Sequence, residues 1–142
     1  MNGNTELLNY VYQNAQMGTN TTKQIMENTD DTGFQDILQK QISGYQDILK
    51  EAQVLLKQHG MDEKGLSKFS EVKSEMMVGM QTMTDKSTPH LAEMMLLGSN
   101  MGVVDALKNL RKYNDADSGV KQLMQKLLHF EEANAEHFKP LV

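Results

Sequence analysis

Apolar residues recur at alternating steps of three and four positions along almost the whole chain. This spacing places them on one side of an α-helix, whereas a half-buried strand would alternate at every second residue. Turn-forming residues interrupt the pattern, and the stretches between them predict five helices, at residues 6–29, 34–58, 65–83, 89–113 and 119–138. No stretch alternates with period two, so we predict an all-α protein with at least four-fifths of its residues in helices.

Each predicted helix has a stripe of residues expected to face inward. The stripe of residues 6–29 is Leu8, Val11, Ala15, Gly18, Thr22 and Ile25. Residues 34–58 carry the most regular one, which is Phe34, Leu38, Gln41, Tyr45, Ile48, Ala52 and Leu55. In residues 65–83 the inward set is Leu66, Phe69, Val72, Met76, Met77, Met80 and Met83. The last two helices are expected to bury Leu91, Met94, Leu97, Met101, Val104 and Leu107, and Val120, Leu123, Leu127, Phe130 and Asn134.

Residues that favour helix ends stand at the predicted boundaries. Asp31 lies in a short turn and can cap the second helix. Gly60 follows that helix and can adopt the left-handed conformation that ends it. Pro89 falls in the first turn of the next strong helix, after Ser87 or Thr88 as the cap.

The lengths of the predicted loops indicate how the helices are connected. Only a few residues join the first helix to the second and the fourth to the fifth, so each of these pairs is expected to form an antiparallel hairpin. Residues 65–83 with their flanks are long enough to run the length of such a bundle. We therefore predict a four-helix bundle of two hairpins joined by a helical crossover. The alternative is that residues 65–83 form a bundle helix and residues 89–113 a fifth one.

Composition narrows the range of functions. The 142 residues fit one domain, and there is no cysteine for disulfides, thiolate metal sites or cysteine nucleophiles. A net charge of −5 argues against a nucleic-acid partner. No apolar run is long enough to cross a bilayer, and the polar start does not resemble a signal peptide, so we expect a cytoplasmic protein without membrane contact.

Several strings in the chain suggest a relationship to a known superfamily. They are Glu6-Leu-Leu-Asn-Tyr-Val-Tyr near the start, His90-Leu-Ala-Glu-Met-Met, Gly98-Ser-Asn-Met-Gly102, and Glu131-Glu132. Over nearly its whole length the chain resembles small bacterial proteins of the ferritin-like superfamily. The resemblance implies two antiparallel hairpins with a long crossover.

The chain departs from the superfamily's di-iron pattern. Members with a di-iron centre place a Glu on each of two helices and a Glu-x-x-His on each of the other two. No Glu-x-x-His occurs here, and the last helix reads Glu131-x-x-Asn134. Gln41 is the polar residue in the middle of the second helix, and amide oxygens replace carboxylates poorly beside two metal ions. The resemblance therefore argues for the ferritin-like fold and against the usual di-iron centre.

A smaller metal site remains a hypothesis. If the last two helices are antiparallel, His90 and Glu93 lie at the same end of the bundle as Glu136 and His137. Imidazoles and carboxylates are ligands for zinc or iron. Glu131 falls beside the apolar stripe and is a further candidate ligand. The simpler interpretation, which we favour, makes the four end residues ordinary surface residues and Glu131 a boundary residue that reaches solvent.

Two further features concern how the helices pack against each other or against a partner. The chain has twelve methionines, and their inward spacing favours core filling over soft-metal ligation or a pliable interface. Gly98 and Gly102 are four residues apart and predict a close helix contact, either internal or between copies. No acyl-, phosphoryl- or glycosyl-transfer motif is present, so we do not expect an enzyme.

We predict a non-catalytic structural or interaction module that self-associates or binds a protein partner through a helix face. Divergent iron or zinc binding is the alternative.

Overall fold

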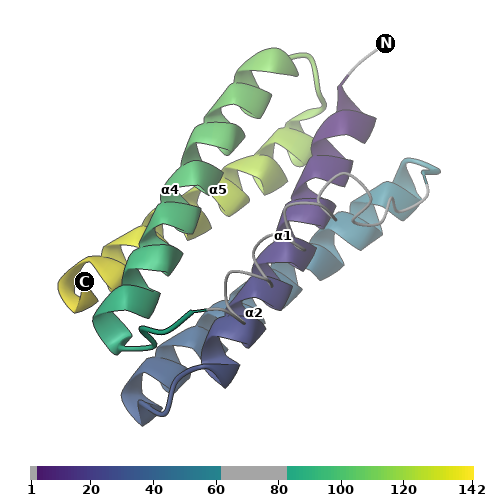
Figure 1. Ribbon diagram of the computed structural model, residues 1–142. Coiled ribbons are helices and arrows are strands. Elements are labelled where there is room, and N and C mark those ends of the chain that lie inside the picture. Colours follow the sequence, from purple (N-terminus) through teal and green to yellow (C-terminus); the bar gives the residue numbers. More distant parts are fainter. Residues whose placement is uncertain (1–2, 62–82) are drawn as a thin grey trace.

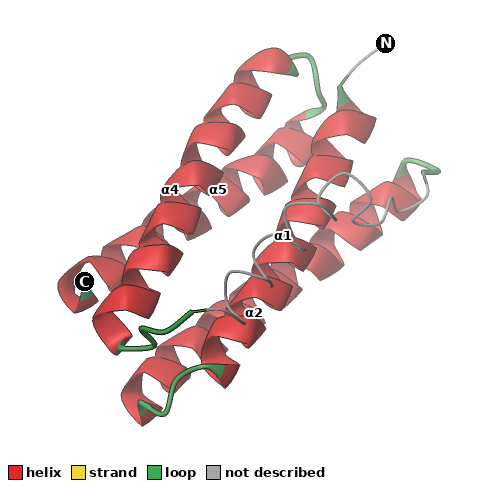
Figure 2. Cartoon of the chain, viewed as in Figure 1, coloured by secondary structure: helices red, strands yellow, loops and turns green. Residues whose placement is uncertain are grey.

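A computed structural model describes residues 3–61 and 83–142, and within these ranges the chain is a helical bundle (Figure 1). Its elements are α1 (Asn4–Glu27), α2 (Thr32–Gln58), α4 (Thr88–Lys112), α5 (Ser118–Phe138) and the short 3₁₀ helix η2 (Lys139–Leu141). Helices make up 84% of the described part, which has no strand (Figure 2). The all-α prediction is confirmed there, with every boundary within two residues. The helix predicted at residues 65–83 lies outside the described residues except for Met83.

The predicted helix ends are confirmed at three places. Asp31 caps α2, because its Oδ1 accepts a hydrogen bond from the backbone N–H of Phe34 at 3.1 Å. Ser87 is the N-cap residue of α4, and Pro89 lies in the first turn of that helix. Gly60 follows α2 with a φ of +67°, a conformation that a residue with a side chain rarely adopts.

Two antiparallel hairpins form the bundle, as predicted. The end of α1 packs against the start of α2, where Ile25 and Phe34 share one apolar cluster, and Leu8 and Leu56 belong to the other cluster at the opposite end. In the other hairpin α4 and α5 lie side by side in opposite directions (Figure 1). None of the helices in the described ranges is long and apolar enough to cross a lipid bilayer.

Side-chain contacts at the two ends show how the hairpins are related. Just after α2, the Met61 sulfur accepts a hydrogen bond from Thr5 at the start of α1, with the two atoms 2.9 Å apart. At the opposite end of the bundle, the Thr88 hydroxyl at the start of α4 donates to Asp31 at 2.8 Å. The helices α2 and α4 therefore begin at the same end and run parallel, so the chain between them connects opposite ends of the bundle.

The apolar core consists of two clusters. The first joins the start of α1 and the end of α2 to the neighbouring halves of α4 and α5, with Leu8, Val11, Ile48, Leu56 and Leu127 among its members. The second lies at the opposite end and contains Ile25, Phe34, Leu38, Leu91, Ala92, Met95 and Phe138. The stripes predicted for α1, α2 and α5 are largely buried, although Leu55 at the end of α2 is only partly buried.

The stripe predicted for α4 is wrong in most of its members. Of the six residues expected inward, Leu91 is buried, whereas Leu97, Met101, Val104 and Leu107 are between 49% and 67% exposed. The buried face of α4 consists of Leu91, Ala92, Met95, Ser99 and Ala106. Small side chains on that face let α4 lie close to its neighbours, and the larger apolar residues at helical spacing are left outside.

Candidate functional site

A layer of buried polar side chains separates the two apolar clusters. Each of the four helices contributes to it: Thr22 from α1, Gln41 and Tyr45 from α2, Ser99 from α4, and Glu131 and Asn134 from α5. All six are no more than 5% exposed. Buried polar groups need partners to offset the loss of water, so the contacts within this layer decide what it can do.

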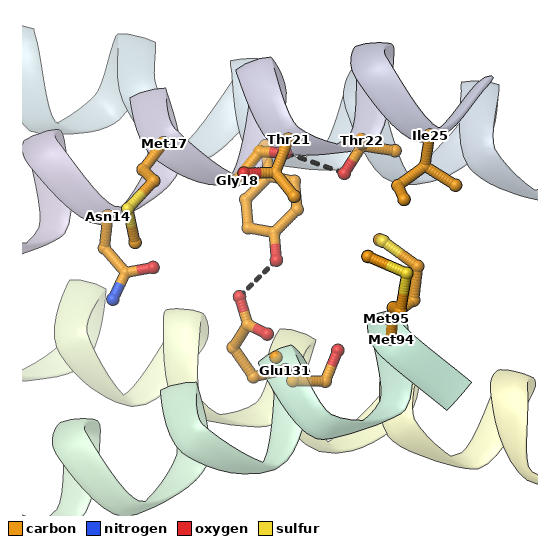
Figure 3. Close-up of a pocket in the computed structure, with 12 residues that line it drawn as sticks. Asn14, Met17, Gly18, Thr21, Thr22, Ile25, Met94, Met95 and Glu131 are labelled. Carbon is orange, nitrogen blue, oxygen red and sulfur yellow. Dashed lines mark hydrogen bonds between the residues drawn. The ribbon is translucent and has the colours of Figure 1, made fainter. Parts of the chain in front are cut away.

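Glu131 is the ionisable centre of the layer. It is 2% exposed, and the hydroxyl of Tyr45 donates a hydrogen bond to its Oε1 (dashed line at Glu131 in Figure 3). Burial raises the pKa of Glu131 to about 7, although hydrogen bonds from Tyr45 and Ser99 act in the opposite direction. Burial and the neighbouring carboxyl also raise the pKa of Tyr45 well above its ordinary value. The Glu131 carboxyl therefore exchanges its proton near neutral pH.

Two glycines make room for these side chains. A Cβ at Gly18 of α1 would lie 2.5 Å from the Tyr45 ring, and a Cβ at Gly102 of α4 would lie 3.2 Å from the Glu131 carboxyl. Residues without side chains at these positions let the phenol and the carboxyl meet in the centre of the bundle. The glycines thus account for the close approach of all four helices at the layer.

Two side-chain amides in the layer have polar atoms without hydrogen-bond partners in the described structure. Both polar atoms of the Gln41 side chain and the Nδ2 of Asn134 are buried without a hydrogen-bond partner in the described structure. Gln41 and Asn134 lie together along a groove between α2 and α5. The layer therefore holds one carboxyl group, Glu131, together with the two neutral amides.

The favoured interpretation of Glu131 as a boundary residue is wrong. Its helical spacing placed it beside the apolar stripe that contains Leu127 and Asn134, and the structure buries it together with them. A carboxyl that stays buried needs a donor, and Tyr45 supplies it from another helix. Helical spacing placed Tyr45 on the inward stripe of its helix but did not identify Glu131 as its partner, and Ser99 was not among the predicted site residues.

The other predicted metal ligands occupy separate places. His90 Nδ1 and Glu93 Oε2 are 3.7 Å apart on the surface of α4, and Glu136 pairs with Lys139 at 2.6 Å. His137 lines the groove between α2 and α5, while Glu131 lies in the buried layer. Within residues 3–61 and 83–142, no three His, Asp or Glu side chains gather closely enough to hold an ion. Iron or zinc binding stays a prediction.

The second candidate site is the exposed apolar surface of α4. We call the residues Leu97, Met101, Val104 and Leu107 the α4 face. Glu93 precedes it on the same side of the helix and Arg111 follows it, and both are exposed. The predicted seam of Gly98 and Gly102 does not form one contact. Gly102 packs against Glu131 inside, whereas a Cβ at Gly98 would meet no atom within 4 Å.

No family model, curated protein or solved structure matches this chain. The relationship to the ferritin-like superfamily therefore stays a prediction, and function has to be argued from the two sites themselves.

Proposed function

We propose that the protein is a non-catalytic interaction module that pairs with a second copy of itself through the α4 face. The observation that carries this proposal is a continuous row of four large apolar side chains, each about half exposed or more, on one helix. Scattered single apolar residues are normal on a protein surface, but a contiguous row at helical spacing is typical of a helix that packs against another.

The charges at the two ends of the α4 face favour a second copy in antiparallel orientation. Glu93 lies before the apolar row and Arg111 after it, and residues 93, 97, 104 and 111 share one line of the helix surface. A two-fold axis at the level of Gly102 would place Leu97 opposite Leu107 of the second copy. The same axis would place Glu93 opposite Arg111 of the second copy, so opposite charges meet at both ends of the seam.

The size of the α4 face sets the expected strength of the dimer. From residue 93 to residue 111 the helix rises about 27 Å, and each copy contributes four apolar side chains. An interface of this kind falls at the small end of specific protein contacts. We therefore expect a dissociation constant on the order of 10 to 100 µM, with exchange between monomer and dimer.

Sedimentation velocity over a range of protein concentrations tests the proposal. The unmodified protein should shift from monomer to dimer as its concentration rises through the micromolar range. Met101→Glu should leave a folded monomer, because the substitution places two carboxylates in the seam. Val54→Glu is the matched control, since Val54 is 54% exposed on α2 and lies outside the α4 face. A monomer at every concentration would overturn the proposal.

Charge reversal tests the orientation of the two copies. Glu93→Arg and Arg111→Glu should each weaken the dimer, because each places like charges together at both ends. The double variant should restore it, since both opposite-charge pairs reform with their signs exchanged. If the double variant is weaker than either single one, the antiparallel register is wrong even where a dimer exists.

A further inference from the structure

A cavity lies beside the buried polar layer, between α1 and α4. Its volume is about 110 Å³, and Figure 3 shows the side chains that surround it. Ile25, Met94 and Met95 form an apolar side, and Glu131 and Tyr45 form a polar floor. Gly98 also lines the cavity and is exposed, so the cavity reaches the protein surface beside that residue.

The side chains that line the cavity combine apolar groups with an acid. Among the described residues, most of the lining is apolar, and it contains two titratable groups, Glu131 and Tyr45, and no Lys, Arg or His. The Glu131 carboxyl can only accept hydrogen bonds when ionised, and one of its oxygens already receives the Tyr45 hydroxyl. An ionised carboxylate in such surroundings is stabilised most by a positive charge that reaches it.

We propose that this cavity binds a small organic cation, a primary ammonium on a short apolar chain. The ammonium would contact the Glu131 carboxylate at the floor. The chain would lie against Ile25, Met94 and Met95, whose unbranched thioethers adapt to differently shaped apolar groups. Apolar cavities of roughly 150 Å³ hold a ligand of benzene size, so a volume near 110 Å³ fits about five non-hydrogen atoms.

The proposal predicts a pH dependence of a definite sign. The carboxylate binds a cation only after losing its proton, and the pKa of Glu131 is about 7. The titratable groups that face it are Tyr45 of α2 and Tyr10 of α1, and Asp105 of α4 interacts with Tyr10. None of these supplies a competing positive charge. From pH 6 to pH 8 the ionised fraction of Glu131 rises about tenfold, and affinity for the ammonium should rise by about the same factor.

The experiment compares two probes on the unmodified full chain by chemical-shift titration. The probes are n-butylammonium, which stays protonated between pH 6 and 8, and 1-butanol, its uncharged counterpart with the same number of non-hydrogen atoms. We expect the ammonium to bind at pH 8 with a dissociation constant on the order of 1 mM, with amide shifts at Gly98, Ser99 and Glu131. The alcohol should bind more weakly and with no change between pH 6 and 8.

Glu131→Gln supplies the matched variant, because glutamine keeps the shape of the side chain without its charge. It should lose the preference for the ammonium and the pH dependence together, while circular dichroism shows an unchanged fold. The comparison of the two probes on the unmodified protein decides the matter even if this variant does not fold. If 1-butanol binds at pH 8 as tightly as n-butylammonium, or if neither probe shifts the residues around the cavity, the proposal is overturned.

Discussion

At the scale of single residues, Glu131 links the stability of the fold to pH. Its pKa is about 7 in the folded protein against an ordinary value of 4.5. Between these values the folded state holds a proton that the unfolded state has released. The free energy of unfolding therefore decreases as pH rises from 4.5 to about 7, by about 3 kcal/mol in total, and changes little from this source outside that window.

Urea unfolding of the unmodified protein and of Glu131→Gln at pH 5 and pH 8 measures this effect. The unmodified protein should lose about 2 to 3 kcal/mol more than the variant between the two pH values, because only Glu131 contributes to the difference. The same pH profile for both proteins would show that the carboxyl titrates in the folded state as it does in the unfolded chain.

Two helical glycines should respond in opposite ways to the same substitution. Gly18→Ala should destabilise the protein by about 1 to 3 kcal/mol, because its Cβ would lie 2.5 Å from the buried Tyr45 ring. Gly98→Ala should stabilise it by about 0.5 to 1 kcal/mol, because alanine favours the helix and its Cβ meets no atom within 4 Å. Thermal unfolding of both variants checks the prediction, and equal shifts would contradict the packing at Gly18.

The centre of the candidate site could be predicted from the sequence only in part. Helical spacing placed Tyr45 on the inward stripe of its helix, which the structure confirms, and placed Glu131 only beside the stripe of α5. Whether the two side chains contact each other depends on the axial register between α2 and α5. The hydrophobic pattern of each helix by itself does not predict that register. Without that register, the common behaviour of glutamate favoured a solvent-exposed interpretation, and the donor that permits burial went unassigned.

At the scale of secondary-structure elements, Asp31 connects the two hairpins as well as capping α2. One carboxylate oxygen accepts the Phe34 N–H, and the other accepts the hydroxyl of Thr88 from the start of α4. These hydrogen bonds lower the pKa of Asp31 below its ordinary 3.8, so they stabilise the ionised form. Their contribution is present above pH 3.8 and is lost as pH falls below that value.

Replacement of Asp31 tests this junction. Asp31→Ala should lower the melting temperature at pH 7, and the difference from the unmodified protein should shrink as the pH falls below 3.8. Asp30→Ala, at the adjacent exposed position, is the control and should change the melting temperature less. If both variants lowered the melting temperature by a similar amount, the effect would come from the loss of one negative charge in this turn and not from the hydrogen bonds of Asp31.

For α4, hydrophobic periodicity predicted the bounds of the helix but not which of its faces is buried. Its bounds were predicted to within one residue, because the caps and Pro89 are local signals. Its orientation was not, since the helix has apolar residues on two sides. Leu97, Met101, Val104 and Leu107 are the larger set, but Ser99, Gly102 and Ala106 allow the closer approach to the neighbouring helices. The face of α4 that is buried is the one that allows the shorter distance between helix axes. Hydrophobicity alone does not predict that distance.

At the scale of the whole molecule, the two sites occupy different sides of α4. The small-residue side meets Glu131 and closes the polar layer, while the α4 face lies outside and is available to another helix. A substitution in the α4 face should therefore alter association without moving the pKa of Glu131. Conversely, Glu131→Gln should leave the dimer intact, so the two proposals can fail independently.

The final prediction concerns the relative direction of the hairpins. Because α2 and α4 begin at the same end, Gln58 and Lys86 should lie at opposite ends of the bundle. The 27 residues of α2 correspond to about 40 Å, so spin labels at positions 58 and 86 should be roughly 35 to 45 Å apart.

The chain has no cysteine, so two introduced cysteines can be labelled without side reactions. Labels at Asp30 and Lys86 serve as the control and should be less than about 20 Å apart, given the contact between Asp31 and Thr88. A short distance for the first pair, measured by pulsed electron paramagnetic resonance, would mean that α2 and α4 are antiparallel, and the crossover between the hairpins would have to be abandoned.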